Sequence, residues 1–201
     1  MGLAVVGGVL FTAGLLTELR CAVGDWPAPW IQRLFSLDGI GGLPRLFITG
    51  VFVAVAVLAG LTATRSPRPV AGWWAGVAAG GVVLAVAKSV STHSAVEQDD
   101  GRYVTLAGGV LLSLLGLVVL WRTGRAWSVR AAWPVTVALA AYAAAALGLD
   151  ELTALVVAVT HSPVARAIAT FIEEGGEAVT ALVVLEIVSR WVPARSRVGQ
   201  S

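Results

Sequence analysis

The chain has 201 residues, of which 57% are hydrophobic and 13% are charged, and its formal net charge is +2. Soluble domains carry about 25% charged residues, so this composition indicates an integral membrane protein and gives no support for a nucleic-acid partner. The single cysteine, Cys21, excludes an intramolecular disulfide and a cysteine-based metal site.

Six apolar segments are long enough to cross a bilayer, since a membrane-spanning helix needs about 20 residues. In chain order we expect spans at residues 2–19, 46–64, 70–92, 104–121, 132–160 and 164–191. The sequence therefore predicts an all-α, integral membrane helical bundle of about six transmembrane helices. We expect one domain over residues 1–192, followed by a short basic cytoplasmic tail at residues 193–201.

Basic residues in the short connections predict the orientation, because Lys and Arg are enriched in cytoplasmic loops. The second-to-third connection, the fourth-to-fifth connection and the tail are basic, whereas the third-to-fourth connection, "HSAVEQDDGR", is acidic. Both termini should therefore be cytoplasmic. Lys88 is the only lysine among 14 basic residues in a chain rich in Ala, Val and Gly, which indicates a bacterial gene and hence the bacterial cytoplasmic membrane.

Two aromatic features accompany this topology. Six tryptophans fall near the predicted cytoplasmic boundary, where they are either an interfacial belt or packing residues: Trp73, Trp74, Trp121, Trp127, Trp133 and Trp191. The loop at residues 20–45 should face outward. Within it, "WIQRLFSL" has an amphipathic pattern typical of a short interfacial helix, although an ordinary ordered loop is the alternative.

Acidic residues concentrate on the outer side of the predicted bundle. Of the 12 acidic residues only Glu186 lies toward the inside, and Arg190 four positions later can pair with it on the helix surface. Both histidines, His93 and His161, also lie on the outer side, and His161 should be a loop residue preceding a helix that starts at Pro163.

The last span, "ARAIATFIEEGGEAVTALVVLEIV", contains three glutamates near its middle. A carboxylate at the bilayer centre costs roughly 2.5 to 3.5 kcal/mol on insertion scales. Glu173, Glu174 and Glu177 are spaced three and four apart, so they share one side of the helix and repel one another. At least one should hold a proton, or a cation must lie between them. Gly175 and Gly176 either allow close helix approach or weaken the helix locally at the same point.

Several polar groups could serve as partners for these glutamates. Ser89, His93 and Glu97 share one face of the third span. The candidate catalytic residues are Glu173, Glu174, Glu177 and His93. The candidate ligands for a divalent cation are His93, Glu97, Glu151, Glu173 and Glu177. Supporting ion pairs are expected from Glu18, Arg20, Lys88 and Asp150, and Arg166 is a further basic candidate.

This arrangement resembles a set of uncharacterised multi-pass bacterial membrane proteins, which have a His and acidic residues in the middle spans and Glu-Glu-x-x-Glu in the final helix. The matching residues are His93, Glu97, Glu151 and the three glutamates of the last span. The pattern would place an acidic pair before the His, where this chain has Lys88 and Ser89, and a Met at Ala178. These departures argue against a metal site, and the resemblance implies no activity.

Three functions fit these observations. The first is a transporter or ion-binding protein that uses protonatable carboxylates. The second is a membrane enzyme acting on a lipid or isoprenoid at the outer leaflet, with a Glu as general acid or metal ligand and His93 as base or ligand. The third is an accessory subunit with a structural polar cluster. The partners implied are the lipid bilayer and a small ion or lipid-like ligand. The lack of an evident internal repeat argues slightly against a carrier.

Overall fold

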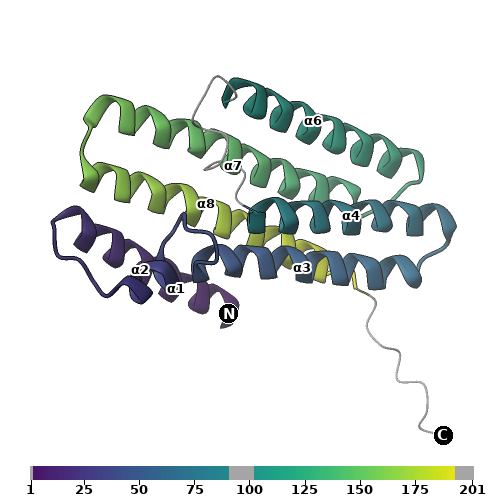
Figure 1. Cartoon of the computed structure of the whole chain (residues 1–201). Coiled ribbons are helices and arrows are strands. Elements are labelled where there is room, and N and C mark those ends of the chain that lie inside the picture. Colours follow the sequence, from purple (N-terminus) through teal and green to yellow (C-terminus); the bar gives the residue numbers. More distant parts are fainter. Residues whose placement is uncertain (1, 91–101, 193–201) are drawn as a thin grey trace, which may run out of the picture.

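The computed structural model describes residues 2–90 and 102–192, with the side chains of residues 102–105 also left undescribed. These residues form helices without a strand, which confirms the predicted all-α class (Figure 1). The helices are α1 (Gly2–Ala22), α2 (Pro29–Phe35), α3 (Leu43–Thr64), α4 (Arg68–Val90), α6 (Arg102–Ala126), α7 (Ala132–Thr160) and α8 (Pro163–Ser189).

Five of these helices are long and apolar enough to cross a membrane. They are α1, α3, α4, α7 and the part of α6 from Leu106 to Ala126. The chain is therefore compatible with a membrane-embedded helical bundle. Helix α8 has 27 residues but is not among the five. It differs from them in carrying five charged residues, namely Arg166, Glu173, Glu174, Glu177 and Glu186.

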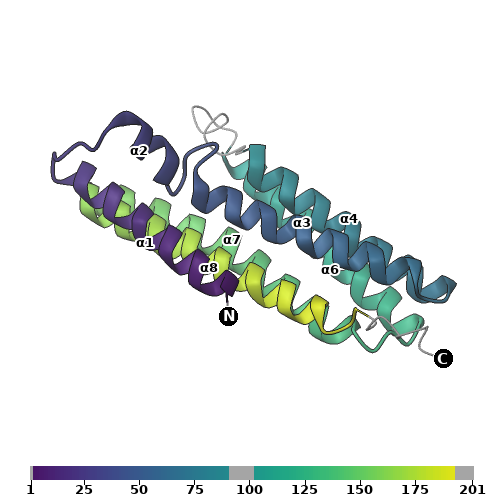
Figure 2. The same ribbon diagram turned by 90° about the horizontal axis from the view of Figure 1, so that it is seen from below.

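Five helices form a closed ring through their neighbour contacts. Helix α3 packs on α4, α4 on α6, α6 on α7, α7 on α8, and α8 returns to α3. Helix α1 lies outside this ring against α8 and α3 (Figures 1 and 2). The contact between α4 and α6 is the least extensive in the ring. The interior of the ring is therefore bounded by side chains from all five helices.

The turn between α7 and α8 is tight and well capped. His161 closes α7 with a positive φ of 51°, and its N–H donates to the carbonyl of Val157 at 3.3 Å. Ser162 caps α8 by accepting a hydrogen bond from the N–H of Ala165 at 3.3 Å, and Pro163 follows at a position where its missing N–H costs nothing. His161 is thus the loop residue before Pro163 that the sequence predicts, and α7 and α8 are held antiparallel.

The short helix predicted in the first long loop is present as α2. None of its residues is buried, so it lies on the surface of the bundle. Leu37, which follows it, is completely buried against α1, where a Cβ at Gly14 would lie 2.5 Å from its Cδ2 atom. Gly14 is therefore required for this close approach, and the anchored Leu37 holds the neighbouring Asp38 in place.

The sequence leaves open whether the tryptophans form an interfacial belt or are packing residues, and they do not all behave alike in the structure. Trp73 and Trp74 are 1% and 3% exposed and pack edge to face with centroids 5.0 Å apart, so both are core residues. The indole Nε1 of Trp73 donates to the carbonyl of Leu120 at 2.9 Å, which ties α4 to α6. Trp133 is 63% exposed and lies at the surface.

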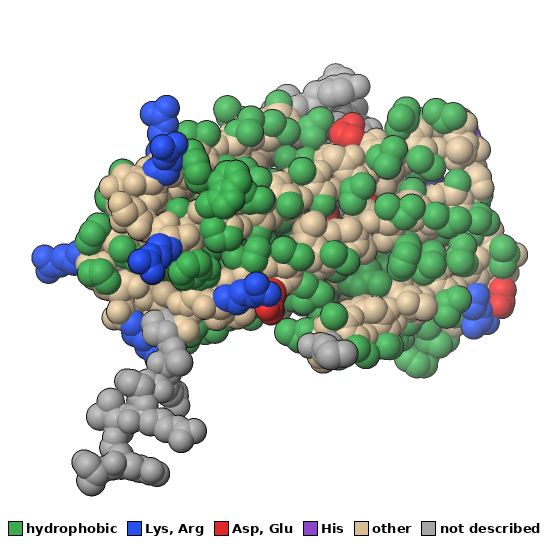
Figure 3. Space-filling view, turned by 180° about the vertical axis from the view of Figure 1, so that it is seen from behind, with side chains coloured by type: hydrophobic (Ala, Val, Ile, Leu, Met, Phe, Trp, Pro, Cys, Tyr) green, Lys and Arg blue, Asp and Glu red, His purple; other side chains and the backbone are tan. Residues whose placement is uncertain are grey.

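The surface shows an apolar middle and a basic end. On the face drawn in Figure 3, hydrophobic side chains cover most of the middle, and Lys and Arg side chains gather at one end. That end holds the α3–α4 turn, the α6–α7 turn and the end of α8 (Figure 1). It carries Arg65, Arg68, Arg122, Arg125, Arg130 and Arg190. We call this the Arg65 end, and the opposite end, with the α7–α8 turn, the Pro163 end.

Candidate functional site

Helix α8 turns its glutamates toward the interior of the ring. Glu174 and Glu177 are 2% and 4% exposed, whereas Glu173 is half-buried. Gly176 permits this placement, because a Cβ there would lie 2.5 Å from the Cδ1 atom of Leu149 on α7. The close approach of α7 and α8 expected from the sequence is therefore present at Gly176.

Lys88, two residues before the end of α4, lies between the two buried carboxylates. Its Nζ atom is 3.0 Å from both carboxylate oxygens of Glu174 and 2.8 Å from Oε2 of Glu177. The Lys88 side chain is 11% exposed. The sequence requires a proton or a cation between like-charged glutamates, and for this pair the cation is the ammonium group of Lys88.

Arg45 supplies a second buried positive charge beside Glu174. Its Nη2 atom donates to Oδ1 of Asp38 at 2.7 Å and lies 3.7 Å from Oε1 of Glu174. The residue is 4% exposed, and its Nε and Nη1 atoms have no hydrogen-bond partner in the part of the chain that the structure describes. Arg45 sits in the first turn of α3, which Gly42 precedes and Pro44 helps to start. Arg45 and Lys88 together balance the formal charge of Glu174 and Glu177.

Tyr142 of α7 completes the contacts of Glu177. Its hydroxyl donates to Oε2 of Glu177 at 3.1 Å, and its ring packs edge to face on Phe52 of α3, with centroids 4.6 Å apart. The hydroxyl and Lys88 Nζ therefore share one carboxylate oxygen. Glu177 thus connects α8 to both α7 and α4.

Glu173 occupies a different position from the other two glutamates. It lies beside Thr153 and Asp150 of α7 and borders a cavity inside the ring. One oxygen from each of Glu173, Glu174 and Glu177 lies within 4.8 Å of the others, a spacing that could hold a metal ion. Because Lys88 already fills the space between Glu174 and Glu177, a metal would have to displace its ammonium group.

A cavity of about 950 Å³ occupies the interior of the ring and reaches these carboxylates. All five ring helices contribute to its wall. Among the described residues, five acidic side chains border it, Asp38, Asp150, Glu173, Glu174 and Glu177, against three basic ones, Arg45, Lys88 and Arg166. When all are ionised, the wall therefore carries a formal excess of two negative charges.

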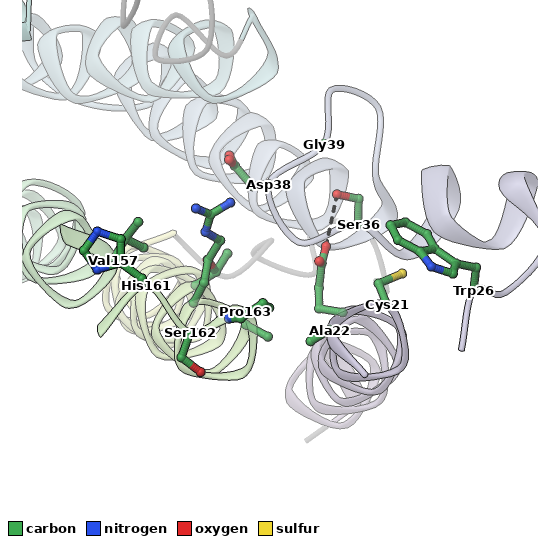
Figure 4. A pocket seen from close by; sticks show the side chains of 14 residues that line it. Cys21, Ala22, Trp26, Ser36, Asp38, Gly39, Val157, His161, Ser162 and Pro163 are labelled. Atoms are coloured by element: carbon green, nitrogen blue, oxygen red, sulfur yellow. Dashed lines mark hydrogen bonds between the residues drawn. The ribbon is translucent and has the colours of Figure 1, made fainter. Parts of the chain in front are cut away.

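A smaller cavity of about 520 Å³ lies at the Pro163 end, between α1, the loop around Asp38 and the start of α8 (Figure 4). Asp38, Val157, Arg166 and Thr170 border both cavities, so the two are adjacent. Figure 4 shows Cys21 and Trp26 on one side of the smaller cavity and His161 on the other. It therefore lies between the Pro163 end of the bundle and the larger cavity.

The other predicted site residues lie at different places in the structure. Asp150 borders the larger cavity, whereas Glu151 borders neither. Glu18 borders the smaller cavity and accepts a hydrogen bond from Ser36 Oγ at 3.4 Å. Arg20 pairs with Asp25, donating to its Oδ2 atom at 2.8 Å.

Of three further predictions, one is confirmed and two concern residues outside the described part of the chain. The Glu186–Arg190 pair expected on the helix surface is present, with 3.0 Å between Oε1 and Nε. His93 and Glu97 lie outside the described residues, so their predicted roles remain predictions.

Sequence reasoning missed Arg45, Tyr142 and Asp38 as parts of the site. The signal for Arg45 is a charged residue within the first turn of an apolar helix, "LPRLF", which needs a buried partner. The signal for Tyr142 is a single hydroxyl-bearing aromatic residue in the Ala-rich run "LAAYAAAAL".

Comparison with protein-family models, with curated proteins and with solved structures gives no match.

Proposed function

We propose that this protein is a six-span protein of the bacterial cytoplasmic membrane that binds a proton or a cation at Glu173, Glu174 and Glu177, as part of transport or ion binding. The observation that carries this proposal is the position of Lys88. Its ammonium lies within 3.0 Å of Glu174 and Glu177 at the wall of a cavity with an excess of carboxyl groups. Glu174 and Glu177 are thus already paired with one positively charged group.

Helix α8 is proposed as the sixth span. Its 27 residues extend about 40 Å at 1.5 Å per residue, which is enough to cross a hydrocarbon core of about 30 Å. Glu174 and Glu177 face Lys88 and Arg45 within the ring, so their charges are neutralised inside the protein. Neutralisation by partners from α3 and α4 removes the main objection to placing Glu174 and Glu177 in a membrane helix.

The proposed chemistry is competition for carboxylate oxygens. An incoming cation meets Glu173 first, because this residue is half-buried and borders the cavity, whereas Glu174 and Glu177 are covered. Further binding at Glu174 or Glu177 requires the ion or proton to replace Lys88 Nζ as the positive partner. Such replacement couples ion occupancy to the position of α4 relative to α8, because Lys88 joins these two helices.

The second candidate function is an enzyme that acts on a lipid or isoprenoid. Apolar side chains from α4, α6 and α7 form much of the cavity wall, which is the observation that favours it. In this case Glu173 would act as general acid toward a polar head group that reaches the Pro163 end. Turnover of a supplied lipid would distinguish this function from reversible binding.

Carboxyl-stretch infrared difference spectra test the first proposal directly. The protein is reconstituted in lipid, and spectra are compared on a change of pH and on addition of Na⁺, K⁺ or Mg²⁺. We expect carboxyl bands that respond to protons or to one of these cations and that lose a component in Glu173→Gln. Glu186→Gln is the matched control, because the Glu186 side chain is 62% exposed and outside the ring. Spectra that change equally in the protein, Glu173→Gln and Glu186→Gln would contradict the proposal.

A further inference from the structure

The larger cavity has charged groups at one end and apolar walls along the rest of its length. On α4 its lining extends from Lys88 back to Gly80, and on α6 from Leu112 to Leu120. Each stretch covers eight residue steps, or about 12 Å at 1.5 Å per residue. The volume of about 950 Å³ falls in the range of sites that hold small organic molecules, about 300–1,000 Å³. An inorganic ion alone would leave most of this apolar volume unfilled.

The charged end of the cavity is suited to a positive group. In the described part of the lining, carboxyl groups outnumber basic side chains there by five to three. Oε2 of Glu174 accepts no hydrogen bond from the described residues, although Glu174 is 2% exposed and Lys88 Nζ lies 3.0 Å away. Glu173 also lines the cavity and is only half-buried. A bound cation at this end would meet carboxylate oxygens in surroundings of low dielectric, where attraction is strong.

The apolar part of the cavity borders the outer surface of the ring between α4 and α6. Val83 of α4 and Leu112 of α6 both line the cavity, yet they are 56% and 65% exposed. These helices form the least extensive contact in the ring. In a membrane, this exposed apolar surface would face lipid, so an apolar molecule could pass from the bilayer into the cavity without crossing water.

From these observations we infer that the cavity binds a lipophilic organic cation, with the positive group at Glu173 and Glu174 and the apolar body against the walls of α4, α6 and α7. This inference rests on the proposed function and names the class of its substrate. Charge selects the cation over a matched anion, and the apolar volume selects an organic cation over an inorganic one.

Tetraphenylphosphonium and tetraphenylborate test the inference, because they match in shape and differ in the sign of their charge. Binding of each radiolabelled ion is measured by equilibrium dialysis against the full chain in lipid nanodiscs, with empty nanodiscs subtracted to remove partitioning into lipid. We expect saturable binding of tetraphenylphosphonium only, and at least about tenfold weaker binding to Glu173→Gln.

A second pair of variants tests the apolar wall independently of charge. Gly116 lines the cavity, and a Cβ added there meets nothing within 4 Å, so Gly116→Phe places a ring in the cavity while the carboxylates stay intact. Gly108 on the same helix also has open space around it but does not line the cavity, so Gly108→Phe is the matched control. We expect Gly116→Phe to weaken tetraphenylphosphonium binding at least about tenfold and Gly108→Phe to leave it unchanged.

The outcomes separate this inference from the proposed function. Equal binding of the two ions, or tetraphenylphosphonium binding that neither Glu173→Gln nor Gly116→Phe weakens, overturns the inference. Infrared bands that respond to protons or inorganic cations, without any tetraphenylphosphonium binding, leave the proposed function standing and also overturn the inference. Size-exclusion profiles and thermal unfolding of each variant confirm that the comparison is between folded proteins.

Discussion

The Nζ atom of Lys88 lies 2.8 Å from Oε2 of Glu177, which joins α4 to α8 across the interior of the ring. The same ammonium lies 3.0 Å from Glu174, so one lysine bridges a pair of carboxylates that would otherwise repel each other. A buried ion pair adds little to stability compared with a well-packed apolar pair, but removal of one partner leaves a charge without compensation. Lys88 is therefore required by the glutamates even if the contact itself stabilises the fold only slightly.

Lys88→Met tests this dependence. We expect the free energy of unfolding to fall by roughly 3–5 kcal/mol, because the substitution leaves Glu174 and Glu177 buried without their ammonium partner. Unfolding in SDS of the protein reconstituted in mixed micelles gives the measurement. Arg190→Met is the control, because it removes one member of an ion pair whose side chains are 69% and 62% exposed. Such a surface pair contributes at most about 1 kcal/mol.

A second substitution should restore part of the stability that Lys88→Met removes. In Lys88→Met combined with Glu177→Gln, one negative charge is removed together with the positive one, so part of the lost stability should return. If Lys88→Met is no more destabilising than Arg190→Met, the buried network does not neutralise the glutamates as described.

Tyr142→Phe removes one hydrogen bond and keeps the ring. The Tyr142 hydroxyl donates to Glu177 at 3.1 Å, and a hydrogen bond to a charged group contributes about 1.5–3 kcal/mol. We expect a loss of this size in SDS unfolding, together with a change in the infrared carboxylate band of Glu177. The edge-to-face contact with Phe52 should persist, so near-ultraviolet circular dichroism serves as the control for packing. An unchanged carboxylate band would contradict the assigned hydrogen bond.

Asp25, in the loop after α1, provides a pH-dependent contact outside the apolar helices. The hydrogen bond from Arg20 is the main cause, and the positive charge of Arg20 the second, of a pKa of the Asp25 carboxyl below its ordinary value of 3.8. Because the pKa is lowered on folding, this contact stabilises the folded state at pH values above the unfolded-state pKa. That contribution is lost as the pH falls through the folded-state pKa. The carboxyl ¹³C shift of Asp25 should therefore titrate below 3.8, and Arg20→Gln should return its pKa toward that value. Identical titrations in the two proteins would contradict the pair.

The glutamate cluster could be located from the sequence because an intramembrane carboxylate requires a partner wherever it occurs. The three- and four-residue spacing of Glu173, Glu174 and Glu177 fixes their common side of α8, and Lys88 is the only lysine in the chain. Lys88 was therefore one of the few partners that the sequence offers for Glu174 and Glu177, and it contacts both in the structure.

The role of Arg45 and the existence of the cavity could not be predicted in the same way. Arg45 reaches Glu174 only because α3 packs against both α4 and α8, which is a property of the ring and not of any one segment. The cavity arises from small residues such as Gly80 and Gly116 on different helices. Periodicity carries no information about these positions, because every face of these helices is apolar.

The membrane orientation can be tested with the single cysteine. Cys21 borders the smaller cavity at the Pro163 end, whereas Arg125 lies in the last turn of α6 at the Arg65 end (Figure 4). The excess of basic residues at the Arg65 end predicts that this end is cytoplasmic. In right-side-out vesicles a membrane-impermeant maleimide should therefore label Cys21, and in a Cys21→Ser background the Arg125→Cys variant should stay unlabelled. Inside-out vesicles should give the opposite result. Reporter fusions after Arg68 and Arg125 should report the cytoplasm, and a fusion after Asp100, which lies outside the described residues, should report the exterior. Labelling of both positions from one side would place the two ends of the bundle on the same side of the membrane. That result would exclude the six-span arrangement, because α8 and the other long helices would not cross the bilayer between these ends.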